Sequence, residues 1–71
     1  MIVTRERRRR ALTLIRHSNV SRLSADAALV LVVGMLIADD EGHIDRQTLA
    51  AAAQDSDTCA VAAELLRQAT S

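Results

Sequence analysis

The sequence predicts an all-α fold, a compact domain of four helices with an arginine-rich helix at its N-terminus. Three observations support this prediction. Apolar residues recur at intervals of three and four positions, not two. The 71 residues include no proline that would break a helix. Residues of the type that caps helix N-termini, Ser, Thr or Asp, precede each of the four apolar segments. We expect one domain over residues 1–71, with the arginine-rich helix inside residues 1–20.

The first helix is expected over residues 5–17, with Thr4 as its N-cap. On a helical wheel, one side is basic and consists of Arg5, Arg9 and Arg16, flanked by Arg10 and His17. The opposite side is apolar and consists of Val3, Ala11, Leu14 and Ile15. Arg7 and Arg8 fall within the apolar arc. We therefore expect them to lie at its margins, with their stems packed and their charged ends in water.

The second helix is expected to follow the cap Ser24 and to carry apolar residues from Leu29 to Ala38. Three acidic residues come next, at positions 39–41, where they oppose the negative end of the helix dipole. We therefore expect the helix to stop at Ala38 or Asp39 and Gly42 to make the turn. Asp45 then caps a third helix over residues 46–54, and the polar residues 55–57 open a fourth over residues 58–68.

The apolar run over residues 27–38 is too short for a membrane span. It holds twelve residues, whereas a helix that crosses a bilayer needs about 20. We therefore expect no membrane insertion and a cytoplasmic protein. The single cysteine, Cys59, excludes an intramolecular disulfide, fits a reducing compartment and is expected to be a small buried apolar residue.

Charge is distributed unevenly along the chain. All nine basic residues are arginines, and six of them lie in the first 16 residues with a single glutamate. The rest of the chain sets three arginines against eight acidic residues. A row of cations can neutralise DNA phosphates and release their counterions. We therefore expect DNA binding, mainly to the backbone, through Arg5, Arg8, Arg9, Arg10 and Arg16. Two alternatives are pairing of these arginines with the acidic body of the same or a neighbouring chain, and an acidic protein partner.

The second helix also bears on assembly, because it is apolar on every side. Three short, alanine-rich neighbours can hardly cover all of it in one chain. We expect a homodimer, or docking on a larger protein, through Leu29, Val30, Val33, Met35, Leu36 and Ile37. A second possible function is therefore a helical protein-interaction module, an adaptor or inhibitor, with no role at nucleic acid.

Catalysis, cofactors and metals are not expected. The acidic residues 39–45 do not form an EF-hand, because Ile44 and Ala50 stand where that loop requires Gly and Glu. His17, His43 and Cys59 lack the spacing of a zinc site. There is no Gly-rich phosphate loop and no supported nucleophile–base motif, so we expect no enzyme.

A group of short motifs resembles the start of winged-helix domains in phage and plasmid replication-initiation proteins. The motifs are Leu-Ser-Ala-Asp-Ala at 23–27, Ala-Asp-Asp-Glu-Gly-His-Ile-Asp at 38–45 and Leu-Ala at 49–50. The resemblance covers about residues 23–68. It implies a helix-turn-helix-like body over residues 23–69, in a DNA-associated accessory or regulatory protein of a phage or mobile element.

The chain departs from that family at two points. The family's β-hairpin wing has no counterpart up to Ser71, and Gln54 and Asp55 occupy the turn where Gly and an apolar residue are usual. The resemblance makes the fourth helix the recognition helix, with residues 55–58 at its start. Asp55 and Asp57 would repel phosphates there. We therefore expect the arginine-rich helix, and not the fourth helix, to hold DNA.

Overall fold

The structure is a computed structural model that describes residues 3–70, with the side chains of Ser21 and Thr70 left out. The described residues form helices and no strand, which confirms the all-α prediction. In chain order the elements are α1 (Arg5–Arg16), the 3-10 helix η1 (Val20–Arg22), α2 (Ala25–Ile37), α3 (Arg46–Gln54) and α4 (Ser56–Thr70).

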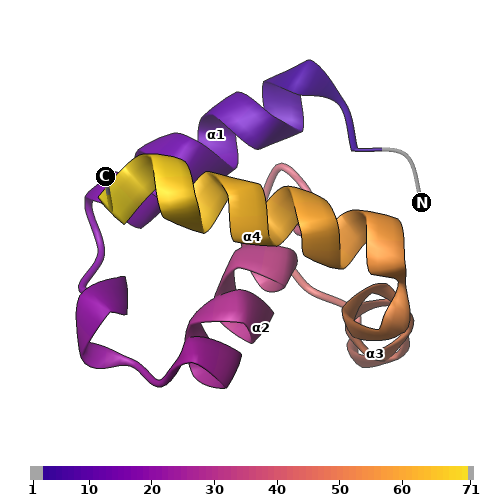
Figure 1. The fold of residues 1–71 in the computed structure, drawn as a ribbon. Coiled ribbons are helices and arrows are strands. Elements are labelled where there is room, and N and C mark those ends of the chain that lie inside the picture. The colour runs from indigo at the N-terminus through magenta and orange to yellow at the C-terminus, as the bar shows by residue number, and fades with distance from the viewer. Residues whose placement is uncertain (1–2, 71) are drawn as a thin grey trace.

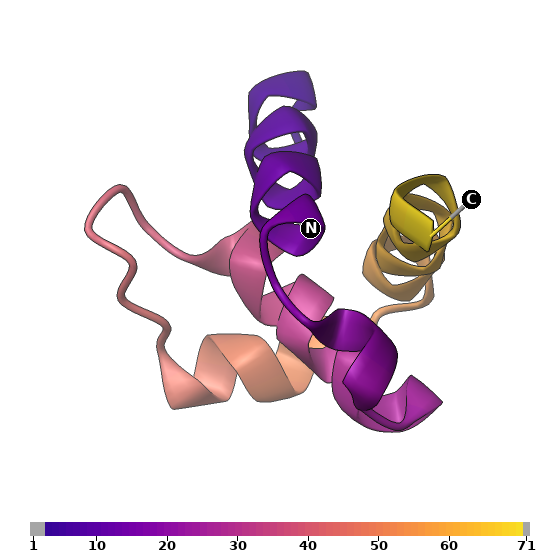
Figure 2. The ribbon, with the colours of Figure 1, turned by 90° about the vertical axis from the view of Figure 1, so that its left-hand side faces the viewer.

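Helix α2 is the centre of the domain. It packs against α1, α3 and α4, and α4 also packs against α1 and α3 (Figure 1). Seen from the side, α4 lies on one side of α2, and the segment that joins α2 to α3 lies on the opposite side (Figure 2). The 3-10 helix η1 leads from the end of α1 to the start of α2. Helix α2 is therefore covered on several sides but not on all.

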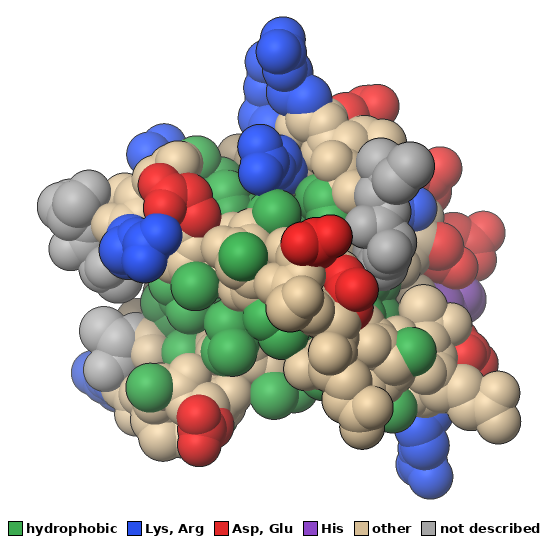
Figure 3. Space-filling model, turned by 45° about the vertical axis from the view of Figure 1, so that its right-hand side comes forward, with side chains coloured by type: hydrophobic (Ala, Val, Ile, Leu, Met, Phe, Trp, Pro, Cys, Tyr) green, Lys and Arg blue, Asp and Glu red, His purple; other side chains and the backbone are tan. Residues whose placement is uncertain are grey.

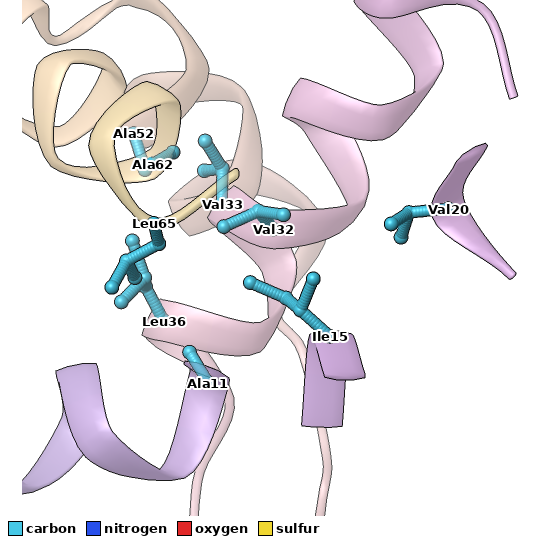
Figure 4. Packing of buried hydrophobic residues seen from close by; sticks show 9 residues of the cluster. All are labelled: Ala11, Ile15, Val20, Val32, Val33, Leu36, Ala52, Ala62 and Leu65. Atoms are coloured by element: carbon cyan, nitrogen blue, oxygen red, sulfur yellow. The ribbon is translucent and has the colours of Figure 1, made fainter. Parts of the chain in front are cut away.

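The core consists of aliphatic side chains that α1, η1, α2, α3 and α4 all supply. Its buried members are Ala11, Ile15, Val20, Val32, Val33, Leu36, Ala52, Ala62 and Leu65 (Figure 4). Three of these nine residues are alanines and the chain has no aromatic ring, so the core is filled by small side chains from closely packed helices. Leu36, which is fully buried, points from α2 into the space beside Leu65 of α4 and Ala11 of α1.

The predicted N-caps of α1, α2 and α3 are confirmed. Thr4, Ser24 and Asp45 each accept a hydrogen bond from the backbone N–H three residues further on. Each bond satisfies one of the N–H groups that the first turn of a helix leaves without a partner. The sequence boundaries were nearly correct at the other end too, since α1 ends at Arg16 and α2 at Ile37.

The start of α4 differs from the prediction. Helix α4 begins at Ser56, two residues before the expected Thr58. The Asp55 carboxylate accepts from the backbone N–H of Thr58 at 2.9 Å and from the Thr58 hydroxyl at 2.6 Å. Asp55 is therefore the cap, and Ser56 and Asp57 belong to the first helical turn. A single residue, Asp55, connects α3 to α4.

The turn after α2 is organised around one carboxylate. Asp39 Oδ1 accepts from the N–H of Glu41 at 2.9 Å and from the N–H of His43 at 2.8 Å. The bond from His43 and, less strongly, the bond from Glu41 hold the pKa of Asp39 below its ordinary value. Gly42 has φ of +84°, in the left-handed region, as its predicted place in the turn requires.

Candidate nucleic-acid interface

The arginines of α1 fall into separate groups. Arg5, Arg9 and Arg16 are exposed, on the side of the helix opposite the buried Ala11 and Ile15. From Arg5 to Arg16 this basic side extends about 16 Å along the helix axis. The amphipathic pattern predicted for α1 thus leaves a row of three cations open to solvent.

Arg8 lies on the side of α1 that faces α4. Together with Arg5 and Arg9 it lines a hollow of about 260 Å³ between the two helices. The other lining residues are apolar or belong to α4: Leu12, Val61, Glu64, Leu65 and Gln68. Arginine side chains carry the positive charge and the hydrogen-bond donors that bind a phosphate group.

One carboxylate in that hollow opposes the arginines. Glu64 pairs with Arg67 one turn further along α4 and accepts a weaker bond from Gln68 at 3.4 Å. The hydrogen bond from Arg67, followed by the bond from Gln68, holds the pKa of Glu64 below its ordinary value. Glu64 is therefore charged at neutral pH, and it weakens the positive potential that Arg8 adds to the hollow.

Arg7 and Arg10 turn the other way, to the end of α2. Arg7 Nη1 donates to the carbonyl oxygens of Leu36 at 2.9 Å and of Ala38 at 3.1 Å. Arg10 Nη2 donates to the same Ala38 oxygen at 2.9 Å, and its Nη1 lies 3.6 Å from Asp40 Oδ1. The last carbonyls of a helix have no intrahelical partner and carry partial negative charge, so guanidinium groups stabilise them.

The position of Arg10 corrects one expected DNA contact. We placed Arg10 among the DNA-binding residues, but in the structure its guanidinium is half-buried and bonded to α2. The expectation that Arg7 merely reaches solvent at the margin of the apolar face is also wrong, because Arg7 bonds to two carbonyls. One feature of the sequence agrees with both contacts: the last turn of α2 has no basic residue of its own to bind its carbonyl groups. Only the tertiary arrangement shows which arginines serve it.

The start of α4 is a poor surface for DNA. Thr58, one of the residues that the winged-helix resemblance assigns to base contacts, is fully buried. Asp57 is exposed in the first turn. The Thr58 hydroxyl, and next its N–H, hold the pKa of Asp55 below its ordinary value, so this cap is also anionic. Helix α4 therefore presents negative charge where a recognition helix approaches phosphates.

The residues expected at a protein interface are distributed differently from the prediction. Val33 and Leu36 lie in the core of the single chain, which corrects their assignment to an interface. Leu29, Met35 and Ile37 are half-buried, and Val30 is exposed. Because α2 is apolar all round, no periodicity in the sequence distinguishes its inner face from its outer face.

The described residues can also be compared with the requirements of a metal site and of a membrane span. Between residues 3 and 70 no three His, Cys, Asp or Glu side chains gather as metal ligands do. Cys59 is half-buried, not fully buried as expected, and its thiol donates to the carbonyl oxygen of Ala53 at 3.2 Å. None of the helices in the described part of the chain has the length and apolar character needed to cross a membrane.

On one face of the molecule, basic side chains lie above an apolar surface. In the space-filling view, arginine side chains project at the top, and apolar side chains are open to solvent below them (Figure 3).

Comparisons with known proteins found no relative that shares the motifs of residues 23–68. No family model, no curated protein and no solved structure matches this chain.

Proposed function

We propose that this protein is a small DNA-associated accessory or regulatory factor that holds the phosphate backbone through Arg5, Arg8, Arg9 and Arg16 of α1. The observation that carries the proposal is the division of the arginines within one helix. Arg7 and Arg10 donate hydrogen bonds to the carbonyl groups at the end of α2. The remaining four leave their charge on the outer and α4-facing sides of α1.

The geometry favours backbone contacts over base reading. Arg5, Arg8 and Arg9 surround one hollow, and Arg16 continues the basic side two turns further on. Guanidinium groups bind phosphate oxygens in pairs of hydrogen bonds. If three or four phosphates are neutralised, the logarithm of the binding constant falls with the logarithm of salt concentration with a slope of about −3. Binding of this kind tolerates many DNA sequences.

Two further features agree with a duplex partner. The chain has no aromatic residue, so it lacks the stacking surfaces that single-strand binders use. Its motifs resemble those of phage and plasmid replication-initiation proteins, which supports a role at DNA of a mobile element. The acidic start of α4 leaves α1 as the element that would approach the duplex.

Fluorescence anisotropy on a labelled random-sequence duplex, over a salt series, tests the proposal. The wild-type protein should bind at low salt with the steep slope given above. The double variant Arg9→Ala/Arg16→Ala should lose much of the affinity and flatten the slope by about two. Arg46→Glu is the matched control, because it changes the net charge by the same amount at one exposed site on α3, away from the hollow.

Circular dichroism would show that both variants keep their helices. An equal loss in the two variants would mean that net charge, and not α1, governs binding. No binding by the wild-type protein at low salt would overturn the proposal and favour the helical protein-interaction module.

A further inference from the structure

Exposed apolar side chains from three segments gather beside the outer side of α2. Leu14 of α1, Leu31 of α2 and Ile44 of the following turn line a hollow of about 420 Å³. Gly34, Met35 and Ala38 complete its apolar side, and Arg10 with residues 39–42 forms its charged side. Leu14, Leu31 and Ile44 are each exposed by between 39% and 46%. Grouped exposed apolar side chains of this kind are typical of surfaces that bind another protein.

The outer face of α2 continues this apolar surface. Ala27, Val30 and Leu31 are exposed, and they follow the spacing that places residues on one side of a helix. Gly34, one turn further on, is buried because Ile44 lies over it: a Cβ built on Gly34 would come within 3.2 Å of Ile44 Cδ1. Ala27, Val30 and Leu31 carry no charge, so covering these three side chains would desolvate no charge.

We propose that a second copy of this chain covers this face, with the two α2 helices antiparallel about a two-fold axis between Val30 and Leu31. A two-fold contact uses the same surface on both copies. In this register a residue that lies a given number of positions before the axis in one copy is opposite the residue that lies the same number of positions after the axis in the other copy. Ala27 of one copy then faces Ile44 of the other, the side chain that covers Gly34, so that a small residue meets a larger apolar one.

The two ends of α2 make this arrangement complementary in shape. Leu23, which precedes α2, is 43% exposed. The proposed register brings Leu23 of one copy level with Ala38 of the other, and Ala38 lines the hollow. Leu23 of one copy thus lies level with the apolar side of the hollow in the other copy.

Charge is complementary in the same register. Arg22 is exposed next to Leu23, and the antiparallel arrangement places it level with the acidic residues 39–41 of the other copy. Asp40 and Glu41 are exposed in that turn. A parallel arrangement would instead bring the two acidic turns together, which costs energy. The absence of net charge on the whole chain means that two copies do not repel each other overall.

Sedimentation equilibrium over a concentration series tests the proposal. The wild-type protein should form a dimer and no larger species. Leu31→Asp places a charge at the centre of the face and should raise the dimer dissociation constant roughly tenfold or more. Ala60→Asp is the matched control, because it places the same charge on an exposed alanine of α4 and should leave the dimer unchanged. Circular dichroism would show that both variants are folded.

A charge exchange tests the antiparallel register. Arg22→Glu alone and Glu41→Arg alone should each weaken the dimer, and the two changes together should restore it. A wild-type protein that stays monomeric into the millimolar range would overturn the proposal. A dimer that Leu31→Asp leaves intact, open-ended association, or weakening by both charge changes without restoration would overturn it as well.

Discussion

Arg7 on α1 donates a hydrogen bond at 2.9 Å to the carbonyl oxygen of Leu36 on α2, 29 residues further along the chain. Together with the bonds that Arg7 and Arg10 make to the carbonyl oxygen of Ala38, this bond satisfies carbonyl groups at the end of α2. The three acidic residues that follow α2 cannot serve its last carbonyls, because carboxylates only accept hydrogen bonds when ionised. Two arginines of the basic helix therefore have a structural role that their neighbours lack.

Replacement of Arg7 should reveal this role. Arg7→Met keeps the stem of the side chain but leaves the Leu36 carbonyl without its donor, and we expect a loss of about 1–3 kcal/mol in the free energy of unfolding. Arg9→Met, on the exposed side of the same helix, should change it by no more than about 0.5 kcal/mol. Urea unfolding at neutral pH measures both. Equal losses would show that Arg7 acts only through general charge.

The two glycines should respond with opposite signs to the same change. Gly42→Ala forces a Cβ into the left-handed region, where φ is +84°, and should cost about 1 kcal/mol or more. Gly34→Ala raises helix propensity by up to about 1 kcal/mol and meets only the end of the exposed, movable Ile44 side chain. We expect the melting temperature to fall for Gly42→Ala and to hold or rise for Gly34→Ala. A fall of the same size in both would contradict this account.

Protonation of the residue that caps α4, Asp55, should lower the stability of the protein in acid. The hydrogen bonds from Thr58 hold the folded-state pKa of Asp55 below the ordinary value of 3.8. Asp55 therefore stabilises the fold above pH 3.8, and this contribution is lost as pH falls through the lower folded-state pKa. The asparagine variant Asp55→Asn should lose less stability than wild type between neutral pH and that acid range.

Chemical denaturation at a series of pH values measures that difference. Asp57→Asn is the control, because it removes the same charge from the same helical turn and leaves the cap intact. An acid dependence that Asp57→Asn reduces as much as Asp55→Asn would assign the effect to the helix dipole and not to the cap.

Substitution by alanine should destabilise the protein more at a buried leucine than at an exposed one. Leu36 is fully buried among side chains of α1 and α4, so Leu36→Ala should cost about 2–5 kcal/mol through lost burial and an unfilled cavity. Leu14 is 46% exposed, and Leu14→Ala should cost clearly less. Thermal unfolding at low protein concentration compares the two. Similar losses would mean that Leu14 is covered in the folded protein.

Local signals in the sequence predicted most of the fold. Thr4, Ser24 and Asp45 were identified as caps because capping depends on residues only three positions apart. The start of α4 was placed too late because residues 55–57 are all good caps, and only the bonds of Asp55 to Thr58 decide between them.

The surroundings of the candidate site could not be predicted in the same way. The helical wheel separates Arg7 from Arg5 and Arg9 but groups Arg10 with them, and it cannot show that Arg7 and Arg10 bind carbonyls about 30 residues away. Val33 and Leu36 were assigned to an interface for a similar reason. A helix that is apolar on every side carries no periodic signal for its buried face, so neighbouring helices determine it.

The anchorage of α1 to α2 also determines what can be done with the basic helix. Many arginine-rich segments are modular tails, which can be cut away or grafted onto another protein without harm to the remainder. Here, deletion of the first ten residues would strip the end of α2 of Arg7 and Arg10 and open the core around Ala11 and Ile15. A truncated chain would therefore lose its fold together with its charge, so substitutions at single exposed arginines, and not deletions, can separate the two.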